Sequence, residues 1–417
     1  MNATFLVVTP ISKCHMPRYF FLSTLILISL FICPAEASGK IFEQVIYPFS
    51  DCTGTAAPLI MGANGHLFGT ARDGGAYKNG CAFELSPNPD GSWSETTLYN
   101  FSDGDPTGGL LFDQSGNLYG TAGGGTYGRG VVYQLSPSPQ GEWTETVLHN
   151  FGNGEDGMGP LGELIFDNAG NLYGVTGLGG KHRGGTVFKL TPGPNGWAET
   201  ILYNFWARIG GPGGYPPIGG VVMDSAGNLY GVTEFGGTYG YGAVYELSPK
   251  NGGYVERLIH SFNGYDGMEC SSGLAMDAMG NLYGTMSISF SGWGTVYQLS
   301  KAAARGKWNL SVLHTLNQND GADPVGPVFI DGAGNLYAAA RTGGFQSQGT
   351  VFMLAPNLNG SWKRTVLHRF HYYNAHYKTG NDGLSPYAGV ILSQGVVYGT
   401  TASGGVNDAG TVFSIKF

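Results

Sequence analysis

One carboxylate stands where the sequence elsewhere repeats a small residue. Glu163 occupies a recurring position that otherwise holds Gly or Pro, namely Pro58, Gly109, Gly220, Gly273, Pro327 and Gly389. We expect this position to begin the strand nearest a central channel, so that the carboxylate points into the channel. It could bind a cation or transfer a proton if a charged partner lies close by, the candidates being Glu155, Glu234, Arg72 and Arg341. The simpler interpretation, which we favour, is a solvated glutamate at the channel mouth.

Aromatic residues fall into a recurring and a non-recurring set. Trp93, Trp143, Trp197, Trp308 and Trp362 recur at one position and are expected to pack inside the fold. The exceptions Trp206, Tyr215, Tyr265 and Trp293 lie in loops of variable length. Their flat apolar rings with a polar group suit a sugar ring or a protein partner. Packing within the loops is the alternative.

The longest insertion covers residues 371–386 and gathers His371, Tyr372, Tyr373, His376 and Tyr377. The two histidines are five residues apart, and no cysteine or carboxylate lies near them at the spacing of a zinc site. Long loops in compact domains are usually functional or disordered. We therefore predict a contact loop and no metal site here.

The aspartates also form two sets. Those that open hairpin turns, which we expect to accept hydrogen bonds from turn amides, are Asp113, Asp167, Asp224, Asp277 and Asp331. Those in the variable loops are Asp103, Asp105, Asp156, Asp266, Asp320, Asp323 and Asp382. Turn capping is again preferred, and calcium binding is the alternative because calcium takes six to eight oxygen ligands. No stretch forms a complete calcium loop, so we expect no cofactor and keep calcium as the open alternative.

The elements that position these residues come from a repeat. A Gly-Asn-Leu-Tyr-Gly-like core recurs seven times, with gaps between 51 residues (Gly65 to Gly116) and 61 residues (Gly334 to Gly395). Each unit contains four short β-branched or aromatic segments separated by Gly, Pro, Asn or Asp, which predicts strands and no helices. The chain begins with a segment of fourth-strand type, residues 41–49, and ends with one of third-strand type. The sequence therefore predicts an all-β, seven-bladed β-propeller of four-stranded blades, in which residues 41–49 complete the last blade and remove unpaired edges.

The repeated motifs carry a family resemblance. GNLYG(T/V)T, followed by GG, GTVF(K/Q)L, VL(Y/H)xF and DGxxP, resembles the GloVer tandem repeat of exported bacterial proteins over nearly all of residues 41–417. The resemblance implies export and a repeat fold, with no established activity. Such proteins typically carry a C-terminal surface anchor, whereas this sequence stops at Phe417 inside the last strand.

The first 37 residues are typical of an export signal. Lys13 and Arg18 precede the apolar run 19–33, which is followed by an Ala-x-Ala pattern ending at Ala37. Fifteen residues are short for a membrane span, which needs about 20. Met16 is an alternative start. We expect residues 1–37 to be removed, leaving one propeller domain (41–417) that is secreted, extracellular or periplasmic, and has no transmembrane segment.

Charge and cysteine content limit the partners and the redox state. The formal net charge is −8, with no basic run, so nucleic acid and anionic membranes are unsuitable partners. We expect a monomer. Cys52 and Cys81 are candidates for a disulfide because an exported chain permits one, which leaves Cys270 free.

No nucleophile, metal or phosphate-binding motif stands out, so an enzyme is the less favoured class. The leading hypothesis is an exported, non-catalytic binding scaffold that contacts a glycan or a cell-surface protein. Its contacts would lie on the variable face, defined as the loops joining second to third strands and fourth strands to the next blade. The candidate contact residues are Trp206, Tyr215, Glu234, Tyr265, Trp293, Arg341, His371, Tyr372, Tyr373, His376 and Tyr377. The alternatives are a hydrolase or lyase for extracellular carbohydrates or lactones, with its site near Glu163, and a structural envelope protein.

Overall fold

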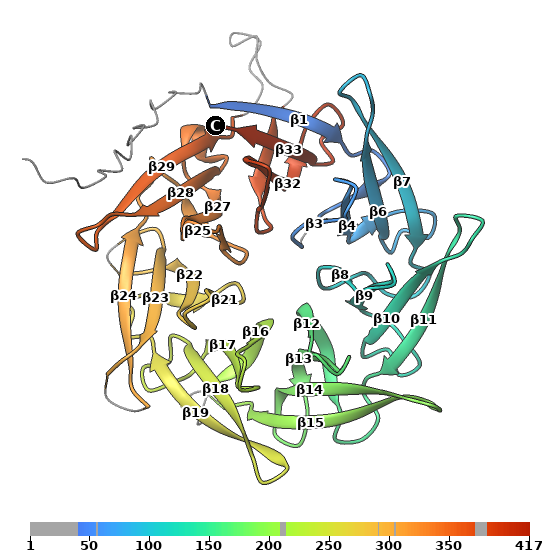
Figure 1. The fold of residues 1–417 in the computed structure, drawn as a ribbon, viewed down its shortest axis with the longest axis vertical. Coiled ribbons are helices and arrows are strands. Elements are labelled where there is room, and N and C mark those ends of the chain that lie inside the picture. Colours follow the sequence, from blue (N-terminus) through green and yellow to red (C-terminus); the bar gives the residue numbers. More distant parts are fainter. Residues whose placement is uncertain (1–40, 56, 209–213, 291, 304–305, 372–381) are drawn as a thin grey trace, which may run out of the picture. The chain divides into compact units, whose positions relative to one another are not determined.

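Short strands arranged in a ring make up the fold (Figure 1). The computed structural model describes residues 41–417 except 56, 209–213, 291, 304–305 and 372–381. Residues Lys40–Phe417 group into one compact unit. Within the described ranges the one helix is the short 3₁₀ turn η1 (Phe345–Ser347), and no helix is long and apolar enough to cross a bilayer. Seven four-stranded antiparallel sheets form the blades of a β-propeller, as the repeat predicts.

The first four blades each follow one stretch of the chain from the channel outwards. Blade 1 contains β3 (Ile60–Met61), β4 (Leu67–Ala71), β6 (Cys81–Pro87) and β7 (Trp93–Asn100). Blade 2 contains β8 (Leu111–Phe112), β9 (Leu118–Ala122), β10 (Val131–Pro137) and β11 (Trp143–Asn150). Blade 3 contains β12 (Gly157–Phe166), β13 (Leu172–Gly179), β14 (Arg183–Gly193) and β15 (Gly196–Trp206). Blade 4 contains β16 (Tyr215–Met223), β17 (Leu229–Phe235), β18 (Ala243–Lys250) and β19 (Gly253–Ser261).

In the last three blades the first strand is interrupted, and both pieces pair with the same second strand. Blade 5 contains β20 (Met268–Cys270), β21 (Ala275–Met276), β22 (Leu282–Ile288), β23 (Thr295–Lys301) and β24 (Trp308–Thr315). Blade 6 contains β25 (Ala322–Pro324), β26 (Phe329–Ile330), β27 (Leu336–Thr342), β28 (Thr350–Pro356) and β29 (Trp362–Arg369). Blade 7 contains β30 (Gly383–Pro386), β31 (Ile391–Ser393), β32 (Val396–Gly404), β33 (Thr411–Lys416) and β1 (Phe42–Pro48).

The N-terminal strand closes the ring. β1 pairs antiparallel with β33, from Phe42 opposite Lys416 to Pro48 opposite Thr411, and Figure 1 shows it as the outer strand of the last blade. The predicted closing segment 41–49 is therefore confirmed, with its first and last residues just outside the strand. Pairing at this position covers the edge that β33 would otherwise expose.

In blades 2 to 6 an aspartate holds the first hairpin turn, as blade 3 illustrates. The Asp167 carboxylate accepts hydrogen bonds from the backbone amides of Ala169 and Asn171 and from the Tyr173 hydroxyl, each at 2.9 Å. Burial opposes ionisation, but these hydrogen bonds outweigh it and lower the pKa of Asp167. Gly170 follows with φ of 79°, a conformation that glycine adopts readily. The predicted turn-capping role is confirmed.

The core lies between neighbouring blades. Tyr133 of blade 2, for example, is fully buried in one cluster with Phe68 and Leu98 of blade 1. Within each blade a third-strand aromatic ring covers a second-strand glycine or alanine: a methyl group added at Gly174 would come within 2.6 Å of the Phe188 ring. The recurring tryptophans contact the preceding blade, as Trp197 does edge-on to Tyr119 at 6.3 Å. This packing explains why most of the repeated residues are structural.

Outer strands also contact one another through a regular pair of side chains. Each outer strand contains a β-bulge, that is, one residue more than the strand it pairs with. In β29, for example, His368 stands opposite Val351 and Val366 opposite Phe352, which leaves Leu367 unpaired between them. In β29 the extra residue, Leu367, is buried, and the bulge turns the following His368 toward the next blade. We call each contact between such a Tyr or His and the residue of the next outer strand that stands opposite a buried third-strand Leu or Ile an outer-strand junction. At the first junction the Tyr99 hydroxyl donates to Glu145 at 3.0 Å.

A disulfide joins Cys52 to Cys81, whose Cα atoms are 6.1 Å apart. Cys52 lies in β2 (Cys52–Thr53), which pairs with β5 (Asp73–Gly74), and Cys81 begins β6. The bond therefore ties the segment that enters blade 1 to the third strand of that blade. Cys270 is buried and free.

Candidate functional site

A cavity of about 700 Å³ opens at the channel mouth, lined by ends of inner strands and loops from several blades. Five of the residues singled out from the sequence line it together: Arg72, Glu163, Glu234, Trp293 and Arg341. They come from blades 1, 3, 4, 5 and 6, so the ring brings them together although they are far apart in sequence. The predicted location of Glu163 beside the channel agrees with this geometry.

Glu163 lies in β12, where the register shifts between Leu161 and Ile165. Its side chain fills space left by a neighbouring glycine: a Cβ at Gly109 would lie 3.3 Å from the Glu163 Cγ and 3.8 Å from its Oε1. Burial in the surrounding protein raises the pKa of Glu163 to about 7, slightly offset by a hydrogen bond from its own backbone. The Glu163 carboxyl is therefore close to half protonated at neutral pH.

The two arginines that border the cavity are each paired with an aspartate. Arg341 forms an ion pair with Asp323 and lies 5.6 Å from the Tyr387 ring centre. Arg72 forms a second pair with Asp105 at 2.9 Å. Both guanidinium groups therefore have a fixed partner at the rim, and neither faces the cavity as an isolated charge.

Two further cavity carboxylates, Glu234 and Glu269, lie between blades 4 and 5. Burial together with the charge of Glu269 raises the pKa of Glu234. Glu269 is a cavity residue that was missed at the level of the sequence. Asp105, Glu269 and Asp323 all stand four residues before the position equivalent to Glu163, so comparing the repeats at that position could have found them. Glu269 and Asp323 also have positive φ values of 58° and 55°, which are uncommon for residues other than glycine.

Trp293 supplies an apolar surface at the rim. Its side chain is 55 % exposed. Its backbone is fixed on both sides, because the amide donates to the Leu316 carbonyl at 3.2 Å and the carbonyl accepts from the Asp323 amide at 2.9 Å. The backbone of Trp293 is therefore tied to that of Asp323, and both residues line the cavity with Arg341.

Comparison with known proteins identifies the family. A model of the Gloeobacter/Verrucomicrobia repeat matches residues 37–217 and 194–413, which covers most of the chain. The chain belongs to the Gloeobacter/Verrucomicrobia repeat family. The resemblance seen in the repeated motifs is thereby confirmed. No curated protein matches this repeat-family chain.

Two solved structures share a weak similarity with the repeat-family chain. One is a crystal structure provisionally described as a gluconolactonase, with 14 % identity, coverage of 91 % of this chain and 92 % of the other, and a TM-score of 0.43. The other is a protein provisionally described as an oxidoreductase (glucose dehydrogenase) from Thermus thermophilus, with 16 % identity, coverage of 78 % and 99 %, and a TM-score of 0.44. Neither similarity is strong enough to support an argument about activity.

Of the other predicted contact residues of this repeat-family chain, those that the structure describes do not line the cavity. Trp206 ends the outer strand β15 and stacks on His182 with ring centres 3.6 Å apart. Tyr265 is 72 % exposed and meets the edge of Phe290. Tyr215 is half-buried in the core between blades 3 and 4. Tyr372, Tyr373, His376 and Tyr377 lie outside the described residues.

Histidine and carboxylate groups converge elsewhere in the repeat-family fold. In the part of the chain that the structure describes, groups of three with ligand atoms within 4.8 Å of one another occur at two outer-strand junctions and not at the channel mouth. The aspartates of these groups, Asp156 and Asp382, were predicted as turn caps. They do accept backbone amides, from Gly157 and His371 respectively, but each also pairs with an outer-strand histidine at 3.1 Å.

Proposed function

We propose that this repeat-family protein is an exported, non-catalytic binding protein that holds a carbohydrate at its channel mouth. The observation that carries the proposal is one cavity in which the exposed Trp293 ring lies beside carboxylates and the Arg341–Asp323 pair. A sugar ring presents an apolar face, which stacks on an indole, and hydroxyl groups at its edge, which hydrogen-bond to planar charged side chains. The chemistry of the cavity matches both parts of such a ligand.

The state of Glu163 supports binding more than catalysis. Burial alone accounts for its raised pKa, and no charged neighbour among the described residues contributes to it. The two nearby arginines are each engaged with an aspartate. General acid–base chemistry requires a second group positioned on the same reacting atoms, and none of these contacts supplies one for Glu163. A carboxyl group that is partly protonated at neutral pH can instead both donate to and accept from a sugar hydroxyl.

The runner-up function is hydrolysis or lyase chemistry on a carbohydrate or lactone. The specific observation in its favour is the pKa of Glu163, about 7, which suits a general acid. It uses the same cavity, so one set of ligands tests both functions.

Export is part of the proposal and rests on residues 1–37, which have the pattern of a cleaved signal. Secretion of the chain with cleavage after Ala37, measured by N-terminal sequencing of protein from the medium or the periplasm, is the expected result. Retention of an intact N-terminus in the cytoplasm would contradict it.

Calorimetric titration of the purified protein with a panel of monosaccharides and oligosaccharides tests the site. Trp293→Ala is expected to weaken binding at least about tenfold, because it removes a stacking contact worth about 1.4 kcal/mol. Glu163→Gln should alter the affinity as well, whereas Trp206→Ala should not, since Trp206 is a similarly exposed tryptophan outside the cavity.

Two results would contradict the binding proposal. The first is equal loss of affinity in the Trp206→Ala and Trp293→Ala proteins, which would place binding outside the cavity. The second is the absence of binding by every sugar in the panel. Appearance of cleaved products that Glu163→Gln abolishes would replace the binding proposal with the runner-up.

A further inference from the structure

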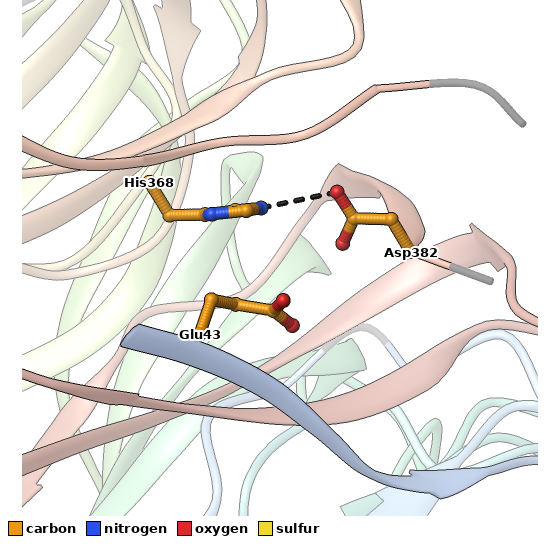
Figure 2. Close-up of side chains that lie close together, drawn as sticks. All are labelled: Glu43, His368 and Asp382. Carbon is orange, nitrogen blue, oxygen red and sulfur yellow. Dashed lines mark hydrogen bonds and ion pairs between the residues drawn. The ribbon is translucent and has the colours of Figure 1, made fainter. Parts of the chain in front are cut away.

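Three ionisable side chains converge where the N-terminal strand meets blade 6. Glu43 comes from β1, His368 from β29, and Asp382 from the segment that leads into β30. Figure 2 shows the side chains facing one another, with the Glu43 carboxylate beside both the His368 ring and Asp382. The His368 Nε2 lies 3.1 Å from the Asp382 Oδ2, and one ligand atom from each residue lies within 4.8 Å of the others.

Two oxygens in this cluster are buried and lack a partner. The Oδ1 of Asp382 and the Oε1 of Glu43 accept no hydrogen bond from the described residues. The Asp382 residue is only 7 % exposed. A buried carboxylate oxygen that is removed from water without a hydrogen bond is costly, so such atoms call for a missing donor or cation.

One other outer-strand junction shows that a cation fits this position. Between blades 5 and 6 the place of Glu43 is taken by Arg364, whose guanidinium lies 2.8 Å from Asp320, the counterpart of Asp382. At the junction between blades 6 and 7 that place holds the carboxylate of Glu43 instead, as it holds Glu145 and Glu199 at two earlier junctions. Burial is the main cause that raises the pKa of Glu43 to about 7, and the charge of Asp382 adds to it.

A second histidine reaches the same aspartate. The His371 Nδ1 lies 3.2 Å from the Asp382 Oδ2. At the similar cluster of His149, Asp156 and Glu199, the residue at the position of His371 is Gly152. The cluster at β1 is therefore the one described junction with two imidazoles and two carboxylates.

We propose that Glu43, His368, His371 and Asp382 bind one divalent transition-metal ion of the zinc class. Imidazole nitrogen and carboxylate oxygen are ligands that zinc accepts, at about 2.0–2.2 Å in tetrahedral sites. Tetrahedral bonds of that length place neighbouring ligand atoms roughly 3.3 Å apart. The separations of 3.1 and 3.2 Å from the two histidines to Asp382 are close to this value.

The metal ion would stabilise the closed ring by holding β1 against blade 6. Three of its ligands belong to blade 6 and to the segment after it, whereas Glu43 belongs to the strand that completes blade 7. Binding would therefore link β1 to the neighbouring blade in addition to its pairing with β33. A ligand that binds only the folded state raises the ratio of folded to unfolded protein by about 100-fold at 100 times its Kd.

The test uses the full chain, prepared without a polyhistidine tag and stripped with dipicolinate. We expect elemental analysis and competition with a chromophoric chelator to give one Zn²⁺ per chain. Glu43→Gln and His371→Asn should each weaken zinc binding by about 100-fold. Zinc should raise the melting temperature of the wild type and not that of either variant. In the metal-free state, Glu43→Gln should melt above the wild type, because it removes one of two buried carboxylates.

Glu199→Gln is the matched control, since it changes the corresponding glutamate of the cluster without a second histidine and should leave zinc binding intact. The proposal is overturned if the wild type binds no zinc, if both β1-cluster variants bind like the wild type, or if Glu199→Gln alone abolishes binding. Calcium binding at equal affinity would overturn the zinc-class assignment, because imidazole ligands disfavour calcium. Should Glu43→Gln fail to fold, His371→Asn on the loop decides the same question.

Discussion

Replacement of Glu163 by Gln should make the protein more stable, and more so as the pH rises. The Gln side chain keeps the size of the glutamate and cannot ionise. The wild-type carboxyl has its pKa raised by burial from 4.5 to about 7. Folding therefore favours its neutral form, so the stability that this group contributes is complete below pH 4.5 and is lost as the pH rises through 7.

The size of the stability difference follows from the change in the pKa of Glu163 between the unfolded and the folded protein. At about 1.36 kcal/mol per pKa unit, the change from 4.5 to about 7 corresponds to at most about 3.4 kcal/mol at high pH. The linkage relation then gives the loss of wild-type folding stability that ionisation of Glu163 causes, about 0.8 kcal/mol at pH 5 and about 3.3 kcal/mol at pH 8. Because the side chain borders an open cavity, solvent reduces these values. We expect the advantage of the variant to grow by about 1 to 2.5 kcal/mol between pH 5 and pH 8.

Urea denaturation of both proteins at the two pH values measures this difference in the free energy of unfolding. Subtracting the wild-type value removes the titration of all other groups. Glu142→Gln serves as the control for the chemical substitution itself, because Glu142 is exposed in the turn between β10 and β11. A stability gap between Glu163→Gln and the wild type that stays constant from pH 5 to pH 8 would refute the reasoning.

Three further predictions concern the scaffold. Tyr133→Phe should stabilise the protein by about 1 kcal/mol in urea denaturation, because the buried Tyr133 hydroxyl has no hydrogen-bond partner among the described residues; a loss of stability would contradict this. The double variant Cys52→Ala/Cys81→Ala should lose about 3 to 4 kcal/mol, the value for a loop closed by cysteines 29 residues apart, and its melting temperature should no longer respond to reductant. Deleting residues 41–49 should expose the β33 edge, and the protein should then elute as aggregates in size-exclusion chromatography. A monomeric product with an unchanged melting temperature would show that closure by β1 is dispensable.

The fold could be predicted because each unit of the repeat carries its own turn and strand signals. Asp167 with Gly170 marks a hairpin, and Gly174 beneath Phe188 marks the second and third strands. The sequence also has one extra strand at residues 41–49. Pairing that strand with the last blade is the arrangement that leaves no free strand edge. These features are local, or recur often enough to be counted.

The candidate site could be predicted only in part. Glu234 and Arg341 lie near the ends of second strands, Glu163 lies within the irregular first strand β12, and Trp293 lies in a short loop, so the blade geometry carries them to the channel mouth. Trp206 lies at the end of the outer strand β15 and Tyr265 in the connection between β19 and β20, and neither lines the cavity. An unusual residue on the first or second strand of a blade is therefore more informative about the channel mouth than one on an outer strand.

The cluster at β1 could not be found from spacing along the chain. The expectation of no metal site near His371 considered short spacings along the insertion, yet Asp382, 11 residues further along it, lies 3.2 Å from the His371 Nδ1. Glu43 enters the same cluster from the opposite end of the chain, through ring closure. Aligning the outer strands would have revealed that Glu43 and Arg364 share a position, although not that a carboxylate there meets His368.

Pairing of the first strand with the last also determines when folding can finish. Phe42 is opposite Lys416, so the earliest part of the propeller to be synthesised waits for almost the entire chain before it finds its partner. Blades 1 to 6 can assemble in order from neighbouring segments, but the final blade requires closure of a very long loop, which is entropically slow. A chain interrupted at any point before β33 thus keeps an unsatisfied strand, and completeness of the polypeptide becomes a condition for a closed, protease-resistant product.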